Sequence, residues 1–155
     1  MTTPYSGTLI FQNTDKEQRQ RIALLVANVL LLTGSLLSFV ILYIAATTQD
    51  WHLFVLYGGN LAFLFLAYFG LRQIQKNNTT NGILLISGSI QITIALLPIL
   101  FTDIAILISL FSSLIASLII SQTLETNVSR KIIPINILAG ILTILLGYLP
   151  LSFRI

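Results

Sequence analysis

Long apolar runs constrain the fold of this chain more than any other feature of its sequence. Five such runs follow one another along its 155 residues, at 22–46, 53–71, 83–101, 104–121 and 132–151. A helix needs about 20 residues, with a range of roughly 17–25, to cross the hydrocarbon core of a bilayer. Because lipid offers no partners to backbone N–H and C=O groups, a spanning segment has to be helical. The runs therefore predict an all-α membrane protein with five transmembrane helices.

The composition supports the same class. Hydrophobic residues make up 55% of the chain and charged residues only 8%, whereas a soluble domain carries about 25% charged residues. A soluble chain of this length has one core and cannot cover five fully apolar helices. The chain has no cysteine, which excludes disulfides, thiolate metal sites and cysteine nucleophiles.

A turn has to separate the third run from the fourth. Residues 83–121 contain a single charged side chain, that of Asp103. One continuous helix over these residues would be roughly 58 Å long, at 1.5 Å per residue, which is far more than a bilayer spans. We therefore expect a tight hairpin at Thr102 and Asp103.

The Lys and Arg residues predict the orientation. With five spans, all of the basic residues except Arg154 fall on one side of the membrane. Cytoplasmic loops carry the excess of Lys and Arg, so we expect the N-terminus inside and the C-terminus outside, with membrane lipid as a partner. The residues on the inner side are Lys16, Arg19, Arg21, Arg72, Lys76, Arg130 and Lys131.

The two ends of the chain are short and polar. Residues 1–21 form a lead-in, in which Thr14 and Glu17 fit a capping box that satisfies amides of the first helical turn. We therefore expect a helix to start near Asp15. Residues 152–155 form a short C-terminal tail.

Small residues predict where helices pack. Serines recur at every fourth position of 104–121, which places them on one face of a helix. Small residues let helix backbones approach closely, so we expect this face to pack against another helix of the chain or of a neighbouring subunit. A hydroxyl-lined polar path is the alternative. The predicted packing residues are Ser109, Ser113, Ser117, Ser121, Gly140 and Gly147.

Amide side chains also lie inside the runs. Hydrogen bonds between membrane helices are worth about 0.6 kcal/mol each on average, and we expect the amides to join helices in this way. The alternative is a ligand pocket that the amides line. These residues are Asn28, Asn60, Gln91 and Asn136.

The sequence shows no combination of residues that is typical of a catalytic, metal-binding or ion-conducting site. No Asp, Glu, Lys, Arg or His side chain lies inside a run, which argues against proton pumping and voltage sensing. His52, in the loop 47–52, is expected to be solvated; a pH sensor or a pigment ligand is the alternative. Asp50 and Asp103 are too few for a calcium site. We expect no catalytic residue, no metal, no cofactor and, without a basic run, no nucleic-acid partner.

The segment Phe11–Arg21, FQNTDKEQRQR, runs directly into the first apolar run. It resembles the N-terminus of bacterial multidomain signalling proteins of the histidine kinase, GAF and PAS type, in which a polar, basic lead-in precedes a block of apolar helices. The resemblance implies a membrane anchor or sensory module in a bacterial inner membrane. The chain departs from the family pattern because no kinase, GAF or HAMP-like part follows the fifth run, so we expect a shortened relative or a separate structural role.

These features favour one function over two others. We expect a non-enzymatic polytopic membrane module that works by helix–helix association, as a structural subunit or a self-assembling protein, with other membrane helices as partners. The first alternative is a sensory module that binds a small apolar ligand among its spans. The second is an accessory subunit of a pigment or quinone energy-converting complex, for which His52 is the candidate ligand.

Overall fold

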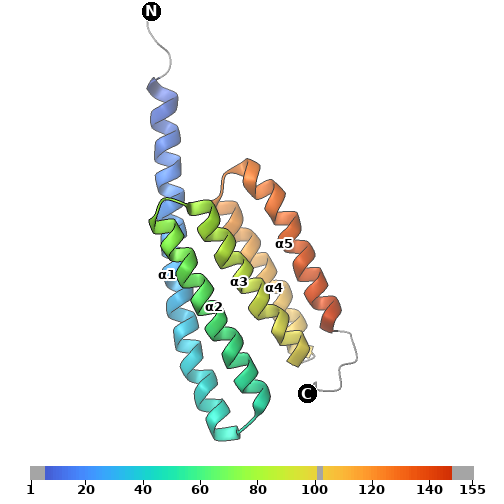
Figure 1. The fold of residues 1–155 in the computed structure, drawn as a ribbon. Coiled ribbons are helices and arrows are strands. Elements are labelled where there is room, and N and C mark those ends of the chain that lie inside the picture. The colour runs from blue at the N-terminus through green and yellow to red at the C-terminus, as the bar shows by residue number, and fades with distance from the viewer. Residues whose placement is uncertain (1–5, 101–102, 148–155) are drawn as a thin grey trace, which may run out of the picture.

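The computed structural model describes residues 6–100 and 103–147, with side chains for 15–96 and 107–145. The described residues form five helices in one bundle (Figure 1), which confirms the all-α class and the number of helices. Their bounds are α1 Ser6–Thr48, α2 Trp51–Gln75, α3 Thr79–Leu100, α4 Asp103–Thr123 and α5 Thr126–Gly147. The predicted break between the third and fourth helices is present. Its turn residues 101–102, the end of the fifth predicted span and the tail 152–155 lie outside the described residues.

α1 is much longer than a membrane span. Its 43 residues extend about 64 Å at 1.5 Å per residue, and its N-terminal part projects beyond the other helices (Figure 1). The expected start near Asp15 is wrong, because the helix already runs from Ser6 and passes through Thr14 without a break. The stretch after Ser6 contains no proline and is rich in Gln, Lys, Glu and Arg, which continue a helix at little cost.

Left-handed residues end the first two helices. At the end of α2, Asn77 has φ 61° and its N–H donates to the Ile74 carbonyl at 3.0 Å. The Asn78 N–H donates to the Gln73 carbonyl at 3.0 Å, which completes a Schellman motif. Gln49 ends α1 with φ 53°. Both turns are therefore short, and consecutive helices run antiparallel.

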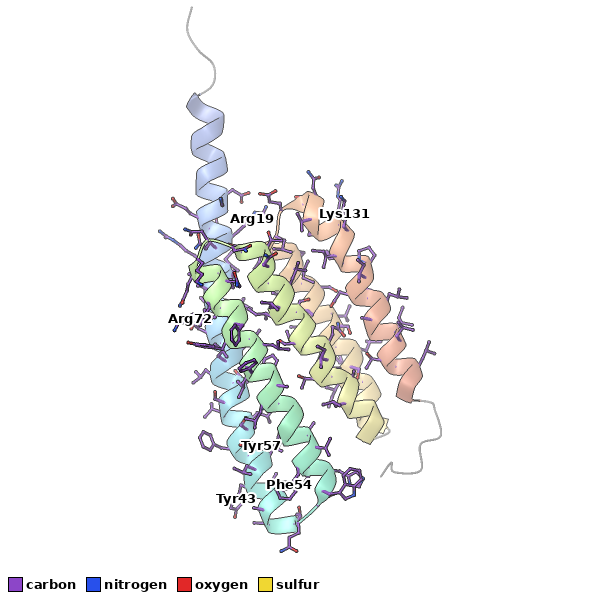
Figure 2. The ribbon with its side chains drawn as sticks, in the orientation of Figure 1. Arg19, Tyr43, Phe54, Tyr57, Arg72 and Lys131 are labelled. Carbon is purple, nitrogen blue, oxygen red and sulfur yellow. The ribbon has the colours of Figure 1, made fainter. Side chains whose placement is uncertain are left out.

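All described Lys and Arg residues lie toward one end of the bundle (Figure 2). This end carries the loops 76–78 and 124–125 and the side chains of Arg19, Arg72 and Lys131. We call it the basic end. The turn between α1 and α2, at residues 49–50, lies at the opposite end.

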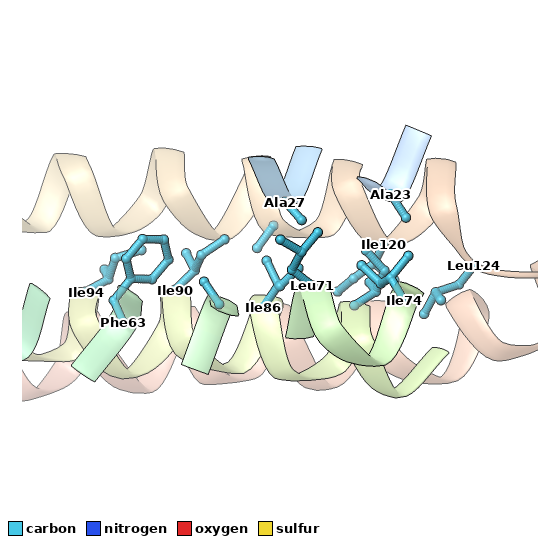
Figure 3. Packing of buried hydrophobic residues seen from close by; sticks show 13 residues of the cluster. Ala23, Ala27, Phe63, Leu71, Ile74, Ile86, Ile90, Ile94, Ile120 and Leu124 are labelled. Carbon is cyan, nitrogen blue, oxygen red and sulfur yellow. The ribbon is translucent and has the colours of Figure 1, made fainter. Parts of the chain in front are cut away.

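α3 is the central helix, since it contacts each of the other four. α1 packs mainly on α2, and α5 packs mainly on α4. Alanines on α1 and α4 allow close approach, while isoleucines on α3 fill the space between helices (Figure 3). The main cluster of buried apolar residues consists of Ala23, Ala27, Phe63, Ala67, Leu71, Ile74, Ile83, Ile86, Ile90, Ile94, Ala116, Ile120 and Leu124.

Two glycines bring α2 and α3 into backbone contact near the basic end. A Cβ on Gly82 would lie 2.6 Å from the Gly70 carbonyl oxygen, and a Cβ on Gly70 would lie 2.8 Å from the Gly82 carbonyl oxygen. Real Cβ atoms essentially never come within 3.0 Å of a heavy atom outside their own residue and its chain neighbours. The observed separation of these helices therefore requires glycine at both positions.

Four of the helices, α1, α2, α3 and α5, are long and apolar enough to cross a membrane. In α4 the described apolar stretch, Leu107–Thr123, is shorter. Candidate membrane spans thus account for four of the five predicted ones, and the predicted span at 104–121 stays a prediction.

Candidate functional site

Four polar side chains from three helices meet inside the bundle. Asn136 of α5 donates through Nδ2 to the Ser113 carbonyl at 3.0 Å and to Ser117 Oγ at 2.8 Å, both on α4. Gln91 of α3 donates through Nε2 to Asn136 Oδ1 at 2.8 Å and to Ser113 Oγ at 3.3 Å. We call Gln91, Ser113, Ser117 and Asn136 the amide cluster. It links α3, α4 and α5 by hydrogen bonds between side chains and backbone of different helices.

One acceptor in the amide cluster is left over. Gln91 Oε1 is buried and has no hydrogen-bond partner in the described part of the chain. The amide orientations follow from their neighbours, because Asn136 Nδ2 has to face the Ser113 carbonyl and its Oδ1 then accepts from Gln91. The cluster therefore combines several good hydrogen bonds with one unsatisfied acceptor, which reduces its net contribution to stability.

The serines of α4 do not share one environment. Ser109 and Ser113 are buried, Ser117 is half-buried, and Ser121 is exposed. The Ser121 hydroxyl donates to the Leu118 carbonyl of its own helix at 2.8 Å. A step of four residues advances about 400° around a helix of 3.6 residues per turn, so the stripe drifts by about 40° at each step. It therefore begins inside the bundle and ends outside it.

Gly140 lies directly opposite Ser113. A Cβ at this position would come within 2.8 Å of Ser113 Cβ and would overlap the hydroxyl group. The close approach of α4 and α5 is thus made within one chain. The surroundings of Gly147 lie outside the described side chains.

The two remaining amides differ from each other. Asn60 of α2 is buried, and its Nδ2 donates to the Gly34 carbonyl at 2.9 Å and to Ser38 Oγ at 2.6 Å on α1. Asn28 of α1 is exposed and donates to the Leu24 carbonyl of its own helix at 2.8 Å. The expectation that Asn28 joins two helices is therefore wrong for contacts within this chain, because its face of α1 points away from the bundle.

Two neighbouring residues of α1, Arg19 and Gln20, form hydrogen bonds with backbone carbonyls at the basic end. Arg19 donates to the Leu124 carbonyl at the end of α4 and pairs with Asp15 at 3.0 Å. Gln20 Nε2 donates to the Ile74 carbonyl near the end of α2 at 3.1 Å. A cation at a helix C-terminus is favourable because it meets the negative end of the helix dipole. These contacts could not be predicted from the sequence, because they join residues far apart in the chain and leave no local pattern.

Two hollows lie on the bundle surface. A polar hollow of about 680 Å³ opens at the basic end between α1 and the loops, and its charged lining residues are Asp15, Lys16, Arg19 and Glu125. A smaller hollow of about 230 Å³ lies between α1 and α2 nearer the opposite end. The smaller hollow opens to the side, since Phe39, which lines it, is exposed.

The turn at the opposite end holds the single histidine. Asp50 Oδ1 accepts from the His52 N–H at 3.0 Å and lies 2.8 Å from His52 Nδ1. The Trp51 and His52 rings are in contact, with their centroids 3.8 Å apart and their planes tilted by 33°. Hydrogen bonds from the His52 side chain and then from its backbone hold the pKa of Asp50 below its ordinary value of 3.8. The expected loop position of His52 is wrong, because α2 already begins at Trp51.

No group of three or more His, Cys, Asp and Glu side chains that could hold a metal ion occurs within the described residues. Comparison of the chain with families of known proteins, with curated proteins and with solved structures finds no match. The structure itself defines a class: an all-α protein of five helices, four of which are candidate membrane spans.

Proposed function

We propose that the chain is a non-enzymatic, multi-pass membrane module that acts by helix–helix association, as a structural subunit or a self-assembling protein. One observation carries the proposal: many large apolar side chains are exposed on the outside of the bundle, while several polar side chains within the apolar runs are buried inside it. Leu25, Leu32 and Phe39 are each more than 60% exposed, while Asn60 and Asn136 are buried with hydrogen bonds between helices. Lipid is the environment that stabilises such a distribution.

The outward face of α1 is the surface on which we place self-association. On the serine face of α4, Ser109 and Ser113 are buried inside the chain and only Ser121, among the described serines of the face, is exposed to a neighbour. On α1, large apolar side chains alternate at spacings of four and three residues, which is the repeat of two helices packed side by side. All of them are more than half exposed: Leu25, Val29, Leu32, Leu36, Phe39 and Tyr43.

The native mass of the detergent-extracted full chain tests this proposal. We expect a discrete oligomer that the double substitution Leu32→Ala and Leu36→Ala converts to monomer. Leu114→Ala with Leu118→Ala is the matched control, because these leucines are similarly exposed on α4. A wild-type monomer free of other chains, or equal effects of both pairs, would contradict the assignment to α1. A complex with other chains would support the subunit form of the proposal.

The small side hollow favours a second candidate function, the sensory or anchor module of a signalling system. A cavity of about 230 Å³ with apolar walls and the hydroxyl-bearing side chains of Ser35, Ser38 and Tyr57 suits a small apolar ligand or part of one. Binding of a lipophilic probe that Leu61→Trp abolishes, with the oligomer unchanged, would support this candidate. Binding that survives the substitution would count against it.

A further inference from the structure

We infer that the basic end binds anionic phospholipid headgroups in the leaflet that it faces. The inference goes beyond the proposed function and rests on its membrane placement. It depends on charge, exposure and the lack of internal neutralisation at one end of the bundle.

Charge is distributed very unevenly between the two ends. The basic end carries seven Lys and Arg side chains, which are all of the eight in the chain except Arg154. It also carries three carboxylates, those of Asp15, Glu17 and Glu125, so its formal charge is 7 − 3 = +4. Among the described side chains, Asp50 is the one Asp, Glu, Lys or Arg at the opposite end.

Most of these cations are not neutralised by the protein. Of the seven, Arg19 forms an ion pair within the described residues, with Asp15. Arg72 donates to the Tyr68 hydroxyl at 2.9 Å and lies 5.3 Å from the centre of its ring, contacts that leave its charge in place. Five exposed side chains have no ion-pair or hydrogen-bond partner in the described part: Lys16, Arg21, Lys76, Arg130 and Lys131.

Their position along the helices matches the level of lipid headgroups. Arg72 lies in the last turn of α2, and Arg130 and Lys131 lie near the start of α5. The ends of a spanning helix reach the interface between hydrocarbon and water. An anionic surface attracts each Lys or Arg near it strongly enough for roughly a fivefold gain in binding.

The lipid-binding surface lies on the outside of the basic end, and the polar hollow is not part of it. The hollow has Lys16 and Arg19 opposite Asp15 and Glu125, so its lining has no formal net charge. The unpaired cations on α2 and α5 lie outside it, where headgroups of the surrounding leaflet can reach them.

Lipid co-purification tests the inference. The full chain is reconstituted in bilayer nanodiscs that contain equal amounts of phosphatidylglycerol and phosphatidylcholine. It is then extracted in a mild detergent, and the lipids that stay bound are identified by native mass spectrometry. We expect phosphatidylglycerol to be retained in excess. Arg130→Gln with Lys131→Gln should lower the excess, by up to roughly fivefold for each cation removed, and raising the salt concentration should weaken it because salt screens these charges.

The matched control removes charge of the opposite sign from the same end. Glu17→Gln with Glu125→Gln should raise the phosphatidylglycerol excess, whereas general damage to the fold would lower it in both double variants. An equal retention of the two lipids by wild-type protein would overturn the inference, and so would loss of the excess on adding millimolar inorganic phosphate at constant ionic strength. Failure of the chain to insert into bilayers would instead overturn the proposed function.

Discussion

Asn28 and Asn136 have the same side chain in two environments. Asn136 is buried and bonds two groups of α4 while it accepts from Gln91 of α3. Asn28 faces outward, and within the described residues its side chain bonds its own helix. Because the two side chains are chemically identical, the difference in their contribution to stability comes from burial and from whether another helix lies opposite the amide.

Alanine at these two positions should therefore have unequal effects. Asn136→Ala removes hydrogen bonds between helices and leaves the Gln91 amide without its main acceptor, so we expect the free energy of unfolding to fall by about 1–2 kcal/mol. Asn28→Ala should change it by less than about 0.5 kcal/mol. Denaturant titration in detergent micelles measures both values. Similar losses for the two variants would contradict the assignment of the amide cluster.

The turn at Asp50 gives a pH prediction. The Asp50 carboxylate forms hydrogen bonds with the His52 side chain, which has the larger effect, and with the His52 backbone N–H. The pKa of Asp50 is therefore lower in the folded chain than its ordinary value of 3.8. The stability that this pair contributes is therefore full above the ordinary value and is lost as the pH falls through the lowered one. NMR titration of the Asp50 carboxyl group should give a midpoint below 3.8, and His52→Ala should move it upward. A midpoint that His52→Ala leaves unchanged would refute the pairing.

At the scale of helices, the close contact between α2 and α3 depends on Gly70 and Gly82. Gly82→Ala places a Cβ against the Gly70 carbonyl oxygen, and overpacking of this kind costs about 1–3 kcal/mol. Gly88 of the same helix has nothing within 4 Å of a Cβ position. Gly88→Ala should therefore stabilise the chain, by about 0.5–1 kcal/mol. Thermal unfolding of the two variants distinguishes them, and a stabilising Gly82→Ala would show that the two backbones lie farther apart.

The drift of the serine stripe around α4 gives a second prediction for this scale. Ser113→Leu inserts a large side chain opposite Gly140 and should separate α4 from α5, at a cost of about 1–3 kcal/mol. Ser121→Leu places the same side chain on an exposed face and should change the stability by less than about 0.5 kcal/mol. Protease sensitivity of the 124–125 loop, compared with unfolding of the whole chain, measures the effect. Equal sensitivity of the two variants would argue against a packing face inside the chain.

The five helices could be predicted from the sequence, because each apolar run is long and is bounded by polar residues or by Asp103. The start of α1 could not, because Thr14 and Glu17 fit a capping box and also fit the middle of a helix. The hydrogen bonds of the four amide side chains were predictable only in part. Asn28, Asn60, Gln91 and Asn136 were visible as polar residues in apolar runs, but which of them face another helix depends on how the helices are rotated, and no local pattern encodes that rotation.

For the whole molecule, we propose that the bundle spans a membrane with its basic end on the cytoplasmic side. Because the chain has no cysteine, a single cysteine can be introduced at either end without a background. Gln49 lies in the turn opposite the basic end, and Asn127 lies in the first turn of α5 at the basic end, both with exposed side chains.

The measurement is the labelling of Gln49→Cys and Asn127→Cys in intact cells by a maleimide reagent that does not cross membranes. We predict that Gln49→Cys reacts in intact cells and that Asn127→Cys reacts only after the membrane has been permeabilised. The reverse pattern would overturn the orientation alone. Equal labelling of both positions, or recovery of the chain in the soluble fraction, would contradict a membrane-spanning bundle.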